Sequence, residues 1–271
     1  MTLPVLHIAI LALIQGITEF LPISSSGHLV LTPVLLGWPD QGLTIDVAVH
    51  VGTLGAVMLY FWRDMALMVG GVIQMAKRRR VNDGGRLLLL LVLATVPVVI
   101  AGSAFNHYWP DGLRSVTLIG WTTLGFGVVL WLADRLGMTM RRIEHLRIFD
   151  VLIIGLSQVL SLLPGTSRSG ITMSAARLLG MERSEAARFS MLMSIPAIMG
   201  AGVLKGLELY ESKDQILTSA ALMAAAMSFV AALITIAFLM AWLRRATFTP
   251  FVVYRIILGG GLLALSYGWF V

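Results

Sequence analysis

The sequence predicts an all-α integral membrane protein with an inverted-topology repeat, in which each half is a re-entrant helix pair plus three transmembrane helices. Hydrophobic residues make up 58% of its 271 residues and charged residues only 13%, against about 25% charged residues in a soluble domain. Long stretches carry no charge, and two segments rich in Gly, Ser and Pro resemble each other. The absence of cysteine excludes disulfides and Cys-based metal sites.

Six stretches are expected to cross the membrane as helices, because a span takes about 20 mostly apolar residues. Three of them contain no charged side chain, and the other three are shorter but similarly apolar. The charge-free stretches are residues 87–105, 115–133 and 216–243, and the shorter ones are residues 47–62, 189–204 and 256–271.

Two further apolar regions are each interrupted by a polar hinge. The first arm, residues 3–18, meets a hinge near 19–28, and the second, residues 148–163, meets a hinge near 164–172. Each hinge is followed by another short apolar arm. Because non-helical backbone at membrane depth must be buried in protein or face a water-filled cavity, each region predicts a re-entrant helix pair.

The basic residues predict the orientation. If residues 77–80 lie in the cytoplasm, 16 of the 20 Lys and Arg fall on that side and Arg114, Lys205 and Lys213 on the other. The cytoplasmic ones lie in segments 63–86, 135–147, 177–188 and 244–255. This positive-inside bias places both termini outside. The net charge of +6 therefore reflects topology, and no nucleic-acid partner is expected.

The two hinge regions align with each other. Residues 16–21 (Gly-Ile-Thr-Glu-Phe-Leu) match residues 155–160 (Gly-Leu-Ser-Gln-Val-Leu), and both hinges end in Ser-x-Ser-Gly. Three spans follow each hinge, so the second half enters from the opposite face. Sites in such repeats form near mid-membrane, where broken segments meet. We predict a single membrane domain over 1–271, with a first repeat over 1–135 and an inverted second repeat over 136–271.

The hinges hold ionisable groups at membrane depth, where such groups mark functional sites. Glu19 and His28 lie in the first hinge and Arg168 in the second. A guanidinium among hydroxyls and helix N-termini suits phosphate oxygens. The residues expected to bind phosphate are Ser24, Ser26, Gly165, Thr166, Ser167, Ser169 and Thr172.

Phosphoryl transfer suits this set, because it requires in-line geometry and neutralisation of charge. His28 is expected to act as general base, general acid or nucleophile, and Ser25 is a second candidate nucleophile, with water as the third. Glu19 is expected to orient or deprotonate His28, or to hold a divalent cation that bridges phosphate oxygens. The remaining histidines lack a zinc-binding spacing and are expected to pack, to face a pore or to lie at the interface: His7, His50, His107 and His145.

Residues 15–28 (Gln-Gly-Ile-Thr-Glu-Phe-Leu-Pro-Ile-Ser-Ser-Ser-Gly-His) and 164–172 (Pro-Gly-Thr-Ser-Arg-Ser-Gly-Ile-Thr) resemble the two signatures of the undecaprenyl-diphosphatase family. This family of bacterial membrane enzymes is associated with bacitracin resistance. Residues 61–63 and 249–255 extend the resemblance over essentially the whole chain. The resemblance implies hydrolysis of undecaprenyl diphosphate, a polyprenyl diphosphate lipid, to undecaprenyl phosphate and inorganic phosphate, which recycles the lipid carrier for cell-wall synthesis.

The resemblance also implies a catalytic set of Glu19, Ser25, His28 and Arg168, and dependence on Mg²⁺ or Ca²⁺. It implies a multi-pass protein of the bacterial plasma (inner) membrane whose site opens to the periplasmic side. The first signature often begins with Glu where this chain has Gln15. Because an amide carries no charge, Glu19 is the expected metal ligand and Gln15 a weak one.

A second function stays open at this stage. A flippase or transporter of polyprenyl phosphate would use an inverted repeat equally well. It would need Arg168 for binding but not Glu19 and His28 as acid–base partners. The oligomeric state is also open, with a homodimer as one alternative.

Overall fold

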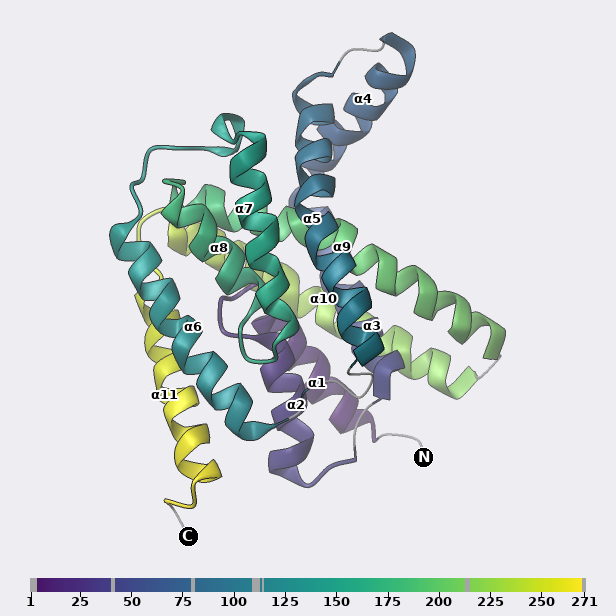
Figure 1. Ribbon diagram of the computed structural model, residues 1–271. Helices are drawn as coiled ribbons and strands as arrows, with labels where there is room; N and C mark the ends of the chain where they lie inside the picture. Colours follow the sequence, from purple (N-terminus) through teal and green to yellow (C-terminus); the bar gives the residue numbers. More distant parts are fainter. Residues whose placement is uncertain are drawn as a thin grey trace.

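The computed structural model describes residues 4–39, 42–78, 81–108, 113, 115–212 and 215–269, and these ranges are helical apart from turns and one isolated bridge between Arg141 and Met181 (Figure 1). The helices are α1 (Val5–Thr18), α2 (Ser25–Leu36), α3 (Gly42–Tyr60), α4 (Trp62–Arg78), α5 (Asp83–Tyr108), α6 (Val116–Leu136), η1 (Ile143–His145), α7 (Ile148–Val159), η2 (Leu160–Leu162), α8 (Arg168–Leu178), α9 (Arg183–Ser212), α10 (Gln215–Leu243) and α11 (Thr249–Ser266).

In the described part of the chain, four helices are long and apolar enough to cross a membrane, and they confirm four of the six predicted spans. These are Asp83–Phe105 of α5, Val116–Leu136 of α6, Leu217–Leu243 of α10 and Thr249–Ser266 of α11. The prediction for 47–62 holds only in part, because α3 passes together with α4, with an 83° bend between them. Residues 189–204 lie in α9, which is not among the candidate spans found in the described part of the chain.

Helix α4 is the clearest departure from the predicted layout. Residues 63–78 were expected only to carry cytoplasmic charge, but they continue as a helix that packs on α5. The helix projects from the end of the molecule opposite the two termini (Figure 1). It mixes exposed apolar side chains such as Leu67 and Val69 with the exposed charges of Arg63 and Lys77, a composition that suits a membrane surface better than the bilayer core.

Both predicted hinge regions are pairs of short helices. Helix α1 packs against α2, and α7 packs against α8. At 14, 12, 12 and 11 residues, each is too short to cross a bilayer alone. The α1–α2 pair lies toward the end that holds both termini, α7 enters from the other end, and the connecting turns meet between them (Figure 1). A hydrogen bond from Ser169 Oγ to the Leu21 carbonyl, 3.0 Å long, joins the two turns.

The helix contacts occur in matched pairs. Helix α1 packs on α10 as α7 packs on α5, and α3 packs on α10 as α9 packs on α5. Helices α3 and α9 contact each other, as do α6 and α11. Exchanging the two halves about a two-fold axis would produce this pattern.

Two aligned glycines permit close contact between the broken helices and the long spans. A Cβ on Gly16 would lie 2.5 Å from Ala231 Cβ of α10, and a Cβ on Gly155 would lie 2.5 Å from the Ala94 carbonyl oxygen of α5. Both distances are shorter than van der Waals contact. The glycines therefore let the broken helices approach the long spans, and so fix the depth of both turns.

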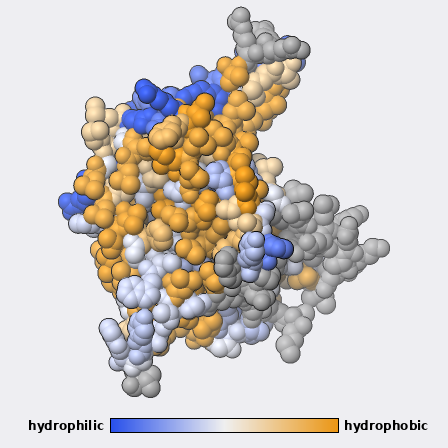
Figure 2. All heavy atoms as spheres, viewed as in Figure 1, coloured by the Kyte–Doolittle hydropathy of each residue, from blue (hydrophilic) through white to orange (hydrophobic). Residues whose placement is uncertain are grey.

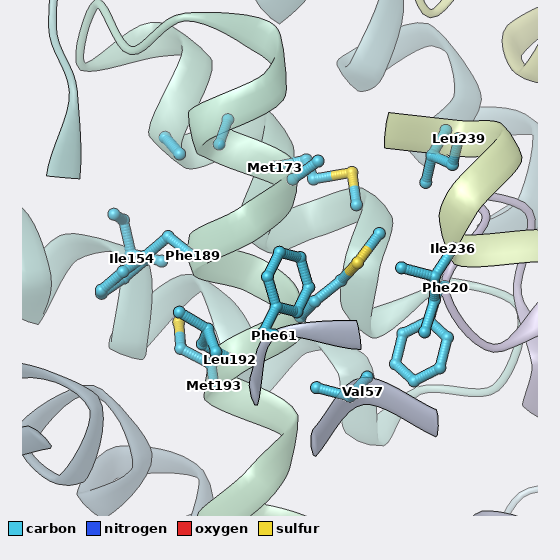
Figure 3. Packing of buried hydrophobic residues seen from close by; sticks show 14 of the residues in the cluster. Phe20, Val57, Phe61, Ile154, Met173, Phe189, Leu192, Met193, Ile236 and Leu239 are labelled. Atoms are coloured by element: carbon cyan, nitrogen blue, oxygen red, sulfur yellow. The ribbon is translucent and has the colours of Figure 1, made fainter. Parts of the chain in front are cut away.

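The main apolar core anchors the first turn. Phe20, which directly follows Glu19, is fully buried and lies beside Ile236 of α10 (Figure 3). Side chains from α3, α7, α8 and α9 belong to the same cluster, and so does Phe61, which lies between α3 and α4. Because the neighbours of Glu19 are held by packing, its carboxylate has a fixed place.

The basic segments gather at the end from which α4 projects. Arg188 pairs with Asp64, Arg183 with Asp134, and the Phe248 N–H donates to Asp134. Hydrophilic residues cover this end, and hydrophobic residues cover the flank below it (Figure 2). The distribution fits a membrane protein with one basic face. Arg114 and Lys213, expected on the other side, lie outside the described residues.

Replacing Gly16 or Gly155 by Ala should lower thermal stability in detergent, because overpacking a tight contact costs about 1–3 kcal/mol. Gly125→Ala is the matched control, since a Cβ at Gly125 meets nothing within 4 Å. A thermal-melt comparison of the three variants tests this. Equal melting temperatures for all three would contradict the role of the two glycines.

Candidate active site

The two turns end in the same backbone conformation. Ser24 and Ser167 have φ of 76° and 71° and are the non-glycine residues with positive φ in the described part of the chain. Each caps the following helix, because its hydroxyl accepts the N–H of Gly27 (3.3 Å) or Gly170 (3.1 Å). Such backbone costs about 1–3 kcal/mol per residue and is concentrated at functional sites.

The first residues of the two capped helices both reach Glu19. Ser25 Oγ donates to Glu19 Oε2 at 2.6 Å, and Arg168 Nη2 donates to Glu19 Oε1 at 2.9 Å. Gln15 Nε2 also donates to Oε2, at 2.9 Å. The Glu19 side chain is 5% exposed and that of Arg168 16%. The predicted meeting of the carboxylate and the guanidinium across the hinges is therefore present, as a direct ion pair.

The hydroxyls expected to bind phosphate are mostly engaged with the protein. Ser24 and Ser167 are the caps, Ser169 bonds the Leu21 carbonyl, and Thr172 Oγ1 lies 2.7 Å from Ser190 Oγ. Ser26 is exposed, whereas the Thr166 hydroxyl is buried without a hydrogen-bond partner among the described residues. Gly165 has a φ of 91°, which suits glycine. What these turns offer a ligand is Ser26, Arg168 and two helix N-termini.

His28 does not contact Glu19 as the sequence suggested. Its Nδ1 lies 2.6 Å from the Ser24 carbonyl and its Nε2 lies 2.6 Å from the Tyr254 hydroxyl. Because a carbonyl only accepts, Nδ1 carries the proton, and Nε2 of the neutral ring accepts from Tyr254. The orientation of His28 is therefore set by Ser24 and Tyr254, and the expectation that Glu19 orients it is wrong.

His50 is the imidazole that lies beside Glu19. Its Nε2 is 3.6 Å from Glu19 Oε2, although we expected His50 only to pack, to face a pore or to lie at the interface. Helix α3 places it there by packing against α1. An ionisable residue in the middle of an apolar stretch was the signal that could have identified it.

Arg255 of α11 lies between the two turns and is hydrogen-bonded to both. It is fully buried, and its guanidinium donates to the carbonyls of Pro22 (3.2 Å), Gly165 (3.0 Å) and Thr166 (3.0 Å). It also bonds the Thr122 and Thr123 carbonyls of α6. The prediction that Arg255 is a cytoplasmic topology charge is wrong. Helix α11 begins at Thr249 rather than near 256, as Pro250 in its first turn could have indicated.

The site carries excess positive charge. Glu19 offsets Arg168, whereas the described hydrogen bonds of Arg255 all end on backbone carbonyls. The N-termini of α2 and α8 add partial positive charge. Such a site can bind phosphate oxygens and place a hydroxyl and an imidazole beside them.

A divalent cation has partial support in the side chains present. No group of three or more His, Asp or Glu that could hold a metal occurs among the described residues. Gln15 Oε1, however, is buried and has no hydrogen-bond partner in the part of the chain that the structure describes. A carboxylate and a free amide oxygen suit a hard cation whose remaining ligands are water and phosphate oxygens, so Glu19 and Gln15 fit such an ion.

Comparison with known proteins gives consistent matches over nearly the whole chain. The model of a family described as bacitracin resistance protein BacA matches residues 8–261. The chain is 55% identical over 269 residues to undecaprenyl-diphosphatase 1 of Rhodospirillum rubrum, covering 97% of this chain and 95% of that protein. It is 50% identical over 262 residues to undecaprenyl-diphosphatase of Ruegeria pomeroyi, covering 96% and 98%.

Replacing Arg255 by Lys should destabilise the protein strongly, because an ammonium cannot reach the five carbonyls that the guanidinium bonds. Hydrogen bonds to charged groups contribute about 1.5–3 kcal/mol each to folding stability. The carbonyls that lose their donor in Arg255→Lys are buried and would stay without that hydrogen bond. Arg245→Lys, at an exposed position, is the control. Equal thermal-melt temperatures for the two variants would show that Arg255 does not hold the turns.

Proposed function

The chain belongs to the bacitracin resistance protein BacA family, and we propose that it is an undecaprenyl-diphosphatase, a membrane hydrolase that releases inorganic phosphate from undecaprenyl diphosphate. The observation that carries the proposal is the bridge between the two turns, where Ser25 and Arg168 share the Glu19 carboxylate. The product, undecaprenyl phosphate, would return to cell-wall synthesis, and its recycling accounts for the bacitracin resistance in the family description.

The geometry favours Ser25 as the nucleophile. Its hydroxyl already donates to Glu19 at 2.6 Å, so Glu19 is placed to accept the proton as Oγ attacks the terminal phosphorus. The bond from that phosphorus to the bridging oxygen breaks, and the electron pair leaves with undecaprenyl phosphate. Water then attacks the phosphoserine and releases inorganic phosphate and the serine.

The remaining groups stabilise charge and move a proton. Arg168 and the N-termini of α2 and α8 would bind the phosphate oxygens as charge develops on them. His28, held by Ser24 and Tyr254, is placed to protonate the leaving oxygen or to activate water. A Mg²⁺ or Ca²⁺ ion on Glu19 and Gln15 would supply further neutralisation when bound.

The proposed topology follows from the matched packing of the two halves. We take residues 1–135 and 136–271 as inverted repeats, each a re-entrant pair plus three membrane helices, with α3 and α9 included among the latter. Both termini would then lie outside in a bacterial inner-membrane protein, with the basic face in the cytoplasm. The site would open toward the periplasm.

A flippase for polyprenyl phosphate is the second candidate, favoured by the same matched packing. Transport would need the positive site but not the contact between Ser25 and Glu19, since moving a lipid requires no nucleophile. Hydrolysis and transport are therefore separated by the variants that follow.

Purified protein with Mg²⁺ or Ca²⁺ should release phosphate from undecaprenyl diphosphate in detergent micelles. Glu19→Ala, Ser25→Ala, His28→Ala and Arg168→Ala should each lower the rate about 100-fold or more, because each removes a base, nucleophile or charge from the transition state. Glu144→Gln and Arg142→Lys, at exposed positions, should keep the normal rate. Wild-type protein without activity would refute the hydrolase, whereas active variants would refute only the assigned roles.

Tyr254→Phe should lower kcat about tenfold and leave KM nearly unchanged, because it keeps the ring beside His28 but removes the hydroxyl on Nε2. Steady-state kinetics over a range of lipid concentrations check this. A change in KM alone would mean that Tyr254 binds the lipid and does not position His28.

A further inference from the structure

His50 is held so that one ring nitrogen faces Glu19. Its Nδ1 lies 2.7 Å from the Asp46 carbonyl, one helical turn earlier in α3. Since a carbonyl cannot donate, Nδ1 carries a proton, and the lone pair of the neutral ring lies on Nε2. That nitrogen is the one 3.6 Å from Glu19 Oε2.

This arrangement needs a positive species between the two atoms. A neutral Nε2 and a carboxylate oxygen both present lone pairs, and Glu19 is almost fully buried. The contact is favourable only if a proton occupies Nε2 or if a cation binds both atoms. Two atoms 3.6 Å apart can share one ion, because the bonds of Mg²⁺ and Ca²⁺ to their ligands are about 2.0–2.6 Å long.

Two observations favour the cation over the proton. Gln15 Oε1, one helical turn before Glu19, is a buried acceptor without a hydrogen-bond partner among the described residues, which a proton on His50 would leave unsatisfied. The bond from His50 Nδ1 to a backbone carbonyl is the outer-shell contact that orients metal-bound histidines.

We propose that His50 Nε2 is a protein ligand of the divalent cation, together with Glu19 Oε2 and Gln15 Oε1. The inference rests on the proposed function for the presence of a cation and adds a nitrogen ligand to it. Water and phosphate oxygens would complete the coordination, as is usual when protein ligands are few. An imidazole favours transition ions, so the site should prefer Mn²⁺ to Ca²⁺.

Pulsed electron paramagnetic resonance of Mn²⁺ bound to the full chain in detergent tests the proposal without any substrate. Wild-type protein should show coupling of the Mn²⁺ spin to a ring nitrogen. His50→Gln should abolish that coupling and weaken Mn²⁺ binding about tenfold or more. His28→Gln is the matched control and should keep both the coupling and the affinity, since His28 binds Ser24 and Tyr254.

Nitrogen coupling that persists in His50→Gln, or unchanged Mn²⁺ affinity, would overturn the proposal and leave the proton as the explanation. If His50→Gln does not fold, His50→Ala takes its place. Mn²⁺ should then raise the melting temperature of wild-type protein and raise that of His50→Ala much less, because an ion bound by the native site stabilises it. Phosphate release measured on the same sample separates the two claims. Hydrolysis without nitrogen coupling refutes this inference alone, and coupling without hydrolysis refutes the proposed function alone.

Discussion

The organisation of this protein depends on how two interrupted helices satisfy their backbone at membrane depth. Where α1 gives way to α2 and α7 to α8, carbonyls and N–H groups lose their helical partners, and lipid offers none. Ser24 and Ser167 bond the N–H groups of the following helices. The buried guanidinium of Arg255 donates hydrogen bonds to carbonyls of both turns. One side chain from the last helix therefore closes the gap between two turns that are more than 130 residues apart in sequence.

Arg255 and Arg168 have different roles, and the difference follows from this constraint. Arg255 is committed to backbone carbonyls, which leaves Arg168 free to pair with Glu19 and to face a ligand. Ser25 and Arg168 occupy the first position of equivalent helices, and one carboxylate receives both. The contacts that join the two turns therefore also bring a carboxylate, a hydroxyl and a guanidinium together. We regard the proposed phosphatase chemistry as a consequence of that junction.

The sequence was sufficient for the features that depend on local composition. Four spans are evident from hydropathy, and the hinges from their Gly, Ser and Pro residues. The convergence of Glu19 and Arg168 was expected because both lie in hinges, whereas their direct ion pair was not. Arg255 was misassigned because counting positive charges treats an arginine near a span end as interfacial. His50 was missed because its partner lies on another helix, and only the packing of α1 against α3 brings them together. The helical nature of α4 was missed because charge was used there only to set topology.

A double-mutant cycle on Glu19 and Arg168 tests most directly whether the two turns meet at this pair. The cycle uses Glu19→Gln, Arg168→Gln and the double variant, with the free energy of unfolding of each measured in detergent. If the turns converge as described, the two effects are non-additive, with a coupling energy of about 1–3 kcal/mol, as expected for residues in direct contact. Additivity within about 0.5 kcal/mol would mean that the two side chains do not touch, and would contradict the junction on which the site is built.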